Sequence, residues 1–205
     1  MANKQTAYNS QKLAKRKAYE ATCAKLLPFS IVGIALSVAV ILLFFVHWAT
    51  IYNTSIGGNE VQISGFNTFF AAITGGYSKT DSLYGDMAVP FYYYAKSYCQ
   101  ASGIFTILAF IVSVLGLFLQ VLATKLHSLH ISVVFLNGLA FLLLLACFIV
   151  SLSMANSDIL PIYCSGNTAC SIRSYAILPA LCALASCVLS VFNTIKYAEA
   201  EKILK

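Results

Sequence analysis

Charged residues are scarce in this chain of 205 residues: Asp, Glu, Lys and Arg together make up 10%, whereas 60% of the residues are hydrophobic. A typical soluble domain is about half apolar and about a quarter charged. So few charges cannot cover a globular surface in water, which argues against a soluble single-domain enzyme, a disordered chain and a basic nucleic-acid-binding domain. The composition therefore predicts an integral membrane protein that has the lipid bilayer, and no nucleic acid, among its partners.

The short motifs that mark common catalytic sites are also missing. The sequence contains no GxxxxGK phosphate loop, no HExxH zinc motif, no GxSxG nucleophile elbow and no CxxC redox pair. The polar residues inside the apolar runs, such as Gln120 and Asn137, carry no charge, which argues against proton-coupled transport and ion pumping. We therefore expect a protein that is not an enzyme and that holds no cofactor and no metal ion.

Long uncharged runs dominate what is present. Each of four runs has between 21 and 24 residues, which corresponds to roughly 31–36 Å of helix, the thickness of the hydrocarbon core of a bilayer. None has the alternating pattern of a barrel strand. The sequence predicts one membrane domain over residues 1–205 with four transmembrane helices, at 26–48, 103–124, 131–154 and 175–195.

Basic residues are distributed unequally between the two sides of these spans. Ten of the thirteen Lys and Arg residues lie in the tails 1–25 and 196–205 or in the short link after residue 124. Because basic residues concentrate on the cytoplasmic side, we expect a multi-pass protein of the plasma or cell membrane with both termini cytoplasmic. The basic N-terminal tail is expected to bind anionic lipid, at about 1 kcal/mol for each basic residue near the surface.

The first predicted outer loop, residues 49–102, is too long for a simple connection, so we expect it to fold. Ala49–Ser55 and Glu60–Ser64 are β-prone and are separated by a Gly-Gly turn signal, which predicts a hairpin. Apolar residues at i, i+3, i+4 and i+7 then predict a short amphipathic helix. The predicted fold class is an all-α membrane protein: a four-helix bundle with a small extracellular cap made of a short β-hairpin and an amphipathic helix.

Exposed aromatic residues of this cap are the candidate interaction surface. The helix that contains the second span is expected to begin near Pro90, to run to about Thr124 and to carry a tyrosine cluster near its start. Trp48 is expected at the outer membrane interface, where aromatic belts lie. The residues predicted to contact a partner are Phe66, Phe69, Phe70, Ile73, Tyr92, Tyr93 and Tyr94.

Three of the seven cysteines, Cys99, Cys164 and Cys170, fall on the predicted outer side, where disulfides are permitted. Cys164 and Cys170 enclose a short segment with Gly-Asn at its centre, which favours a disulfide between these two. The alternative joins Cys99 to one of them and would link the two outer loops. The second outer loop covers residues 155–173.

Small residues recur along the first and fourth spans, at positions that allow close helix packing. They serve either packing inside the bundle or docking of another protein. Gln120 and Asn137, on neighbouring spans, are expected to share a hydrogen bond, and Pro179 is expected to kink the fourth helix. The residues predicted to pack helices are Gly33, Ser37, Cys182, Ser186 and Ser190.

The layout resembles that of the claudin and peripheral-myelin-type tetraspan membrane proteins, with four helices, a long first outer loop containing β-prone runs and a short second loop. The resemblance covers most of the chain, as topology. The family's first-loop signature is a Trp, then Gly-Leu-Trp, then two cysteines, whereas this loop region has one Trp, Trp48, no Gly-Leu-Trp and only Cys99. No site residue of the family is therefore carried over.

The sequence favours a binding role: an accessory or structural subunit that docks laterally or through its cap onto another membrane protein or onto a copy of itself. One alternative is an oligomeric channel or small-solute transporter with a pore lined by Ser, Asn and Gln. A second alternative is a membrane enzyme that acts on thiols or lipids. Recovery of co-purifying proteins would separate the first class from the others.

Overall fold

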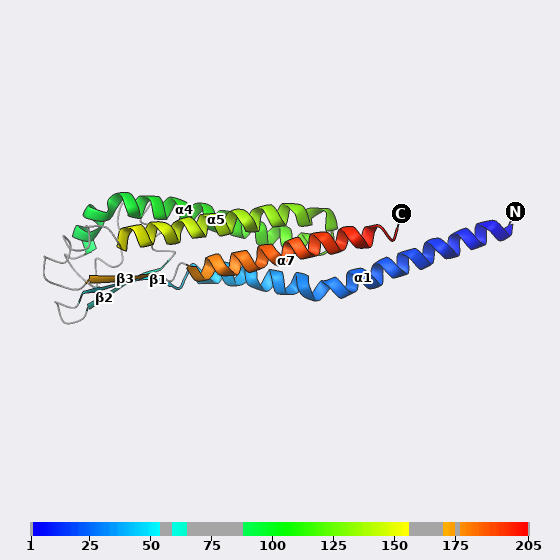
Figure 1. Cartoon of the computed structure of the whole chain (residues 1–205), viewed down its shortest axis with the longest axis horizontal. Coiled ribbons are helices and arrows are strands. Elements are labelled where there is room, and N and C mark those ends of the chain that lie inside the picture. The colour runs from blue at the N-terminus through cyan, green and yellow to red at the C-terminus, as the bar shows by residue number, and fades with distance from the viewer. Residues whose placement is uncertain (1, 54–58, 65–87, 156–169, 175–176, 205) are drawn as a thin grey trace.

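The computed structural model describes residues 2–53, 59–64, 88–155, 170–174 and 177–204. It is predominantly helical, and its four long helices lie side by side with a small sheet at one end (Figure 1). The elements are α1 (Ala2–Leu43), β1 (His47–Asn53), β2 (Asn59–Ser64), α4 (Ala88–Ala123), the 3₁₀ turn η2 (His127–Leu129), α5 (His130–Ala155), β3 (Cys170–Ser174) and α7 (Ile177–Glu201).

All four long helices contain a stretch that is long and apolar enough to cross a membrane, which confirms the four predicted spans by length and composition. A helix satisfies every backbone hydrogen bond internally, as lipid requires. Large apolar side chains point outward from the bundle, as shown by Phe135, which is 70% exposed, and Ile131, which is 69% exposed. These features identify the chain as a multi-pass integral membrane protein. The stretches are Ser10–Leu43, Gln100–Ala123, His127–Ser153 and Ile177–Glu201.

The helices form a closed ring. Helix α1 packs against α4 and α7, and α5 packs against the same two helices from the opposite side. Only the short link of residues 124–129, which contains η2, separates α4 from α5, so these two run antiparallel as neighbours (Figure 1). We call the end of the bundle that carries β1, β2 and β3 the sheet end, and the opposite end, where α4 and α7 finish, the terminal end.

Helix α1 differs from the prediction at both of its boundaries. It is continuous from Ala2 to Leu43, so no break separates the predicted tail from the span, and its N-terminal part extends past the rest of the molecule (Figure 1). Pro28 lies inside α1, where it lacks the N–H that would bond one turn back. At the other end the chain leaves the helix at Leu43, five residues before the predicted limit, through a turn whose amides bond to carbonyls three residues earlier.

The sheet has three antiparallel strands in the order β2-β1-β3. Strands β1 and β2 occupy the β-prone runs and pair in register, with Ile51 opposite Val61. Strand β3 comes from the predicted second outer loop and was not expected; it places Ile172 opposite Ile51 on the other edge of β1. Backbone pairing therefore joins the chain before α4 to the chain before α7. The hairpin turn, residues 54–58, and the predicted amphipathic helix lie outside the described residues.

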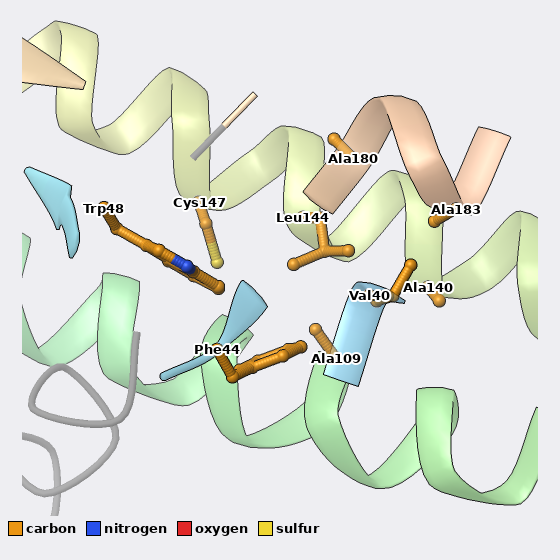
Figure 2. Packing of buried hydrophobic residues seen from close by; sticks show 9 residues of the cluster. All are labelled: Val40, Phe44, Trp48, Ala109, Ala140, Leu144, Cys147, Ala180 and Ala183. Carbon is orange, nitrogen blue, oxygen red and sulfur yellow. The ribbon is translucent and has the colours of Figure 1, made fainter. Parts of the chain in front are cut away.

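A hydrophobic cluster fills the bundle near the sheet end and includes side chains from all four helices (Figure 2). Its most unexpected member is Trp48, which was predicted at the membrane interface but is only 4% exposed. A turn at residues 44–46 joins α1 to β1, and there the indole packs on Phe44 with ring centres 4.9 Å apart, while its Nε1 donates to the Leu43 carbonyl at 2.6 Å. The cluster comprises Val40, Phe44, Trp48, Ala109, Ala140, Leu144, Cys147, Ala180 and Ala183.

Candidate functional site

Uncharged polar side chains gather inside the bundle between the hydrophobic cluster and the terminal end. Every helix contributes at least one, and each is at most 4% exposed. Buried polar groups are costly in a membrane unless they are hydrogen-bonded, so their partners indicate what they do. The set comprises Ser30 and Ser37 from α1, Ser113 and Gln120 from α4, Asn137 from α5, and Ser186, Ser190 and Asn193 from α7. We call it the polar core.

Four of these residues form a directed hydrogen-bond chain through all four helices. The Asn137 amide donates to Ser186 Oγ at 3.0 Å. Ser186 and Ser37 Oγ lie 2.9 Å apart, and Ser37 donates its single proton to Gln120 Oε1 at 2.6 Å. Ser186 must therefore be the donor in its bond to Ser37. The chain thus runs from α5 to α7, α1 and α4 in turn, and it ties together the whole ring of helices.

Ser186 is the centre of this arrangement. Besides Asn137, the Gln120 amide approaches its oxygen at 3.5 Å, and the Gly33 carbonyl lies 3.3 Å away as an alternative acceptor for its proton. Ser190, one turn further along α7, also accepts from Asn137, at 3.3 Å. Spacing by four residues places both hydroxyls on one face of α7, and that face points into the bundle.

Two glycines make room for these side chains. A Cβ atom at Gly33 would clash with the Gln120 amide, so α1 can approach that amide only where it lacks a side chain. At Gly116 a Cβ would lie 3.0 Å from Asn137 Oδ1, closer than side-chain packing normally allows. Gly33 and Gly116 are therefore places where the two amide side chains rest against a bare helix backbone. Such close contact between helices is typical of small residues in membrane bundles.

A second cluster lies closer to the terminal end. The ring of Tyr197 on α7 stacks with those of His127 and His130, at centroid distances of 4.1 and 4.6 Å. The rings of Tyr19 on α1 and His127 are arranged edge to face, with centroids 6.3 Å apart. Near this stack, the Asn193 amide donates to Ser30 Oγ at 3.3 Å and links α7 to α1. The turn after α4 is thus held against both α1 and α7 by aromatic contacts.

Within the part of the chain that the structure describes, no three His, Cys, Asp or Glu residues come close enough to hold a metal ion. Two surface ion pairs, Arg16 with Glu20 and Lys196 with Glu199, are each formed within one helix. The polar core itself consists of neutral hydrogen-bonding groups, Ser, Asn and Gln. Cys23, Cys147, Cys182 and Cys187 are free cysteines.

The structure brings together most of the residues that were predicted to pack helices. Gly33, Ser37, Ser186 and Ser190 meet in the polar core. Cys182 is half-buried and packs against the hydrophobic cluster. The small-residue face of α7 is therefore occupied within this chain.

Other predicted site residues can be placed only in part. Tyr92, Tyr93 and Tyr94 lie in the first two turns of α4, without described side chains, and Cys170 begins β3 opposite Asn53. The remaining predicted interaction and disulfide residues lie outside the described part of the chain: Phe66, Phe69, Phe70, Ile73 and Cys164.

Some features of the site differ from the prediction or were missed. Gln120 and Asn137 are linked through Ser186 Oγ, to which both amides donate, and not by the direct bond that was expected. Pro179 is the third residue of α7, in the first turn, where proline is tolerated, and not at a kink. Tyr197 was missed because it lies past the apolar run, although its aromatic ring close to a helix end was a usable signal.

An apolar groove lies on the outward side of α5. It has a volume of about 410 Å³, and Gly138 forms part of its lining beside Cys187 of α7. Phe135 and Leu142, one turn on either side of Gly138, are strongly exposed beside it. The groove is therefore a concave surface within the membrane-spanning region.

The chain matches no family model, no curated protein and no solved structure. Its four apolar helices are compatible with a tetraspan membrane topology, and none of these comparisons supports membership of the claudin or peripheral-myelin family.

Proposed function

We propose that this protein is a non-enzymatic accessory or structural subunit of the membrane, which docks laterally through its helices and through a cap on the extracellular side. In this proposal both termini are cytoplasmic, as the ten basic residues of the tails and the α4–α5 link indicate. The sheet end then faces outward, and the three strands form the base of the cap.

The observation that carries the proposal is the hydrogen-bond chain from Asn137 to Gln120. Polar side chains inside membrane proteins often line a path for a solute or a proton. Here they bond to each other across all four helices, which favours a rigid scaffold over a conduit within one subunit. A channel would then need a pore between several subunits, because the polar groups inside one subunit are bonded to each other. The accessory or structural role therefore has the stronger support.

We propose that the lateral docking surface is the groove beside Gly138. A transmembrane helix of the partner would bind in this groove. Its lining is apolar, and Gly138 allows close approach of a helix backbone. The small-residue face of α7 is not available for this role, because Ser186 and Ser190 are buried in the polar core.

The test is purification of the full chain from its native membrane in mild detergent, followed by native mass measurement and identification of co-purifying chains. Leu142→Trp fills the rim of the groove and should reduce the recovered complex roughly tenfold, which corresponds to about 1.4 kcal/mol. Phe118→Trp is the matched control, since Phe118 on α4 is exposed to nearly the same extent. A strictly monomeric protein without partners would refute the subunit role. Equal loss in both variants would refute the groove as the docking surface.

A further inference from the structure

Ser113 is the one member of the polar core whose hydroxyl is buried without a hydrogen-bond partner. Serine and threonine hydroxyls inside membrane helices commonly donate to the carbonyl one turn earlier. In this structure Thr106, Ser151 and Ser190 do so, at 2.7 to 3.0 Å. Because Ser113 does not, its hydroxyl must find a different partner or leave a buried polar group unsatisfied, which costs about 1–3 kcal/mol.

Beside Ser113 the four helices leave a small cavity, with room of about 10 Å³ for a water molecule. This is close to the smallest space that one water can occupy. All four helices line the cavity, and half of the lining residues are polar. The polar ones are Ser37, Ser113 and Asn137, and the apolar ones are Val40, Ala140 and Ala183.

The hydrogen-bonding groups that remain unused around the cavity match those of one small molecule that can both donate and accept hydrogen bonds. Asn137 uses its amide nitrogen on Ser186 and Ser190, so its Oδ1 is the atom left to accept a bond. That oxygen faces α4, because it lies against Gly116, three residues after Ser113 on the same helix. Ser37 Oγ donates to Gln120 and accepts from Ser186, which leaves one lone pair.

We propose that the cavity between Ser113, Ser37 and Asn137 is a binding site for one structural water molecule. The water accepts a hydrogen bond from the Ser113 hydroxyl. It donates one hydrogen bond to Asn137 Oδ1 and a second to Ser37 Oγ. Three hydrogen bonds are the usual number for a buried water. The water adds a second connection of α4 to α5 and α1, and it brings Ser113 into the hydrogen-bond network of the polar core.

The site can be tested by nuclear magnetic resonance on the full chain in detergent micelles or nanodiscs. The expected result is magnetisation transfer from a long-lived water to the side-chain amide of Asn137, with loss of this signal in Ser113→Ala. Thr194→Ala, on the same bundle but away from the cavity lining, is the control and should keep the signal. Absence of the water signal in the unmodified protein would overturn the proposal.

A stability measurement gives an independent test through the sign of the effect. If a water is bound, Ser113→Ala removes a satisfied hydroxyl, and the midpoint of unfolding in a denaturing-detergent titration shifts to lower concentration. If the cavity is dry, the same substitution removes an unsatisfied hydroxyl, and the midpoint stays the same or rises. An unchanged or raised midpoint therefore overturns the proposal.

Discussion

The hydroxyl oxygens of Ser37 and Ser186 lie 2.9 Å apart, although the two residues are 149 positions apart in the sequence. Their contact places the first and last membrane helices side by side in the centre of the bundle. Since Ser37 also binds Gln120 and Ser186 also binds Asn137, this pair is the middle step of the chain that connects all four helices. The energetics of this chain can be tested one residue at a time.

Ser186→Ala should lower the free energy of unfolding by about 2 kcal/mol, because Asn137 and Ser37 both lose their shared partner. The measurement is the unfolding equilibrium in a denaturing-detergent titration. Thr194→Ala is the control on the same helix: its hydroxyl donates to the Ser190 carbonyl of α7 itself. Equal losses in the two variants would show that the bond between helices contributes no more than the local one.

Gly33→Ala should destabilise the bundle by about 1–3 kcal/mol, because the added methyl group displaces the Gln120 amide from Ser37. Gly138→Ala is the comparison, since a Cβ there would meet Cys187 Sγ at an ordinary 3.6 Å. We expect Gly138→Ala to leave stability unchanged or slightly raised. In the double variant Gly33→Ala with Gln120→Ala the two effects should be less than additive, and strict additivity would contradict the clash.

Phe44→Ala should cost about 3 kcal/mol of stability, whereas Phe45→Ala should cost much less. The two residues are neighbours in sequence, but Phe44 is 1% exposed and Phe45 is 57% exposed. Phe44 packs between Trp48 and Phe110, with ring centres 4.9 and 5.2 Å away, as part of the cluster in Figure 2. Unfolding titrations of both variants provide the measurement, and a reversed order would contradict the burial of Phe44 in the turn after α1.

Fusions to the chain's C-terminus test the proposed orientation. With a cytoplasmic C-terminus, a green fluorescent protein fusion should be fluorescent and a fusion to an enzyme that is active only outside the cytoplasm, such as alkaline phosphatase, should be inactive. A second pair of fusions in the segment between β2 and α4 should give the opposite result. The physical basis is the excess of basic residues in the tails and the α4–α5 link. An active phosphatase at the C-terminus would reverse the assignment of the sheet end to the outside.

Much of the membrane architecture was predictable from local composition. Uncharged runs of bilayer length give helices in lipid regardless of how they pack, so the four spans followed from the sequence. The boundaries were less predictable: α1 continues through the basic tail, since Lys and Arg are good helix formers, and it stops at Leu43 while the chain is still apolar. Trp48 illustrates this, because its burial and its hydrogen bond to the Leu43 carbonyl depend on the turn between α1 and β1.

The candidate site was predictable as a set of residues but not as an arrangement. Burial of Ser, Asn and Gln follows from their positions inside apolar runs. Their partners do not, because hydrogen bonds between helices depend on the rotation and axial position of each helix. Gln120 and Asn137 illustrate this: the sequence suggested that they bind each other, and the structure places Ser186 between them. Strand β3 likewise required the tertiary structure, since its partner β1 is more than one hundred residues away.

The sequence by itself determined that this chain is a membrane protein with four spanning helices, because too few charges remain to face water and four apolar runs match the bilayer. The tertiary structure alone decided that the helices close into a ring and that Asn137, Ser186, Ser37 and Gln120 meet in one chain of hydrogen bonds. The physical reason is that the length of an apolar run is a local property of one segment. A hydrogen bond between helices forms only once the relative positions of two distant segments are fixed.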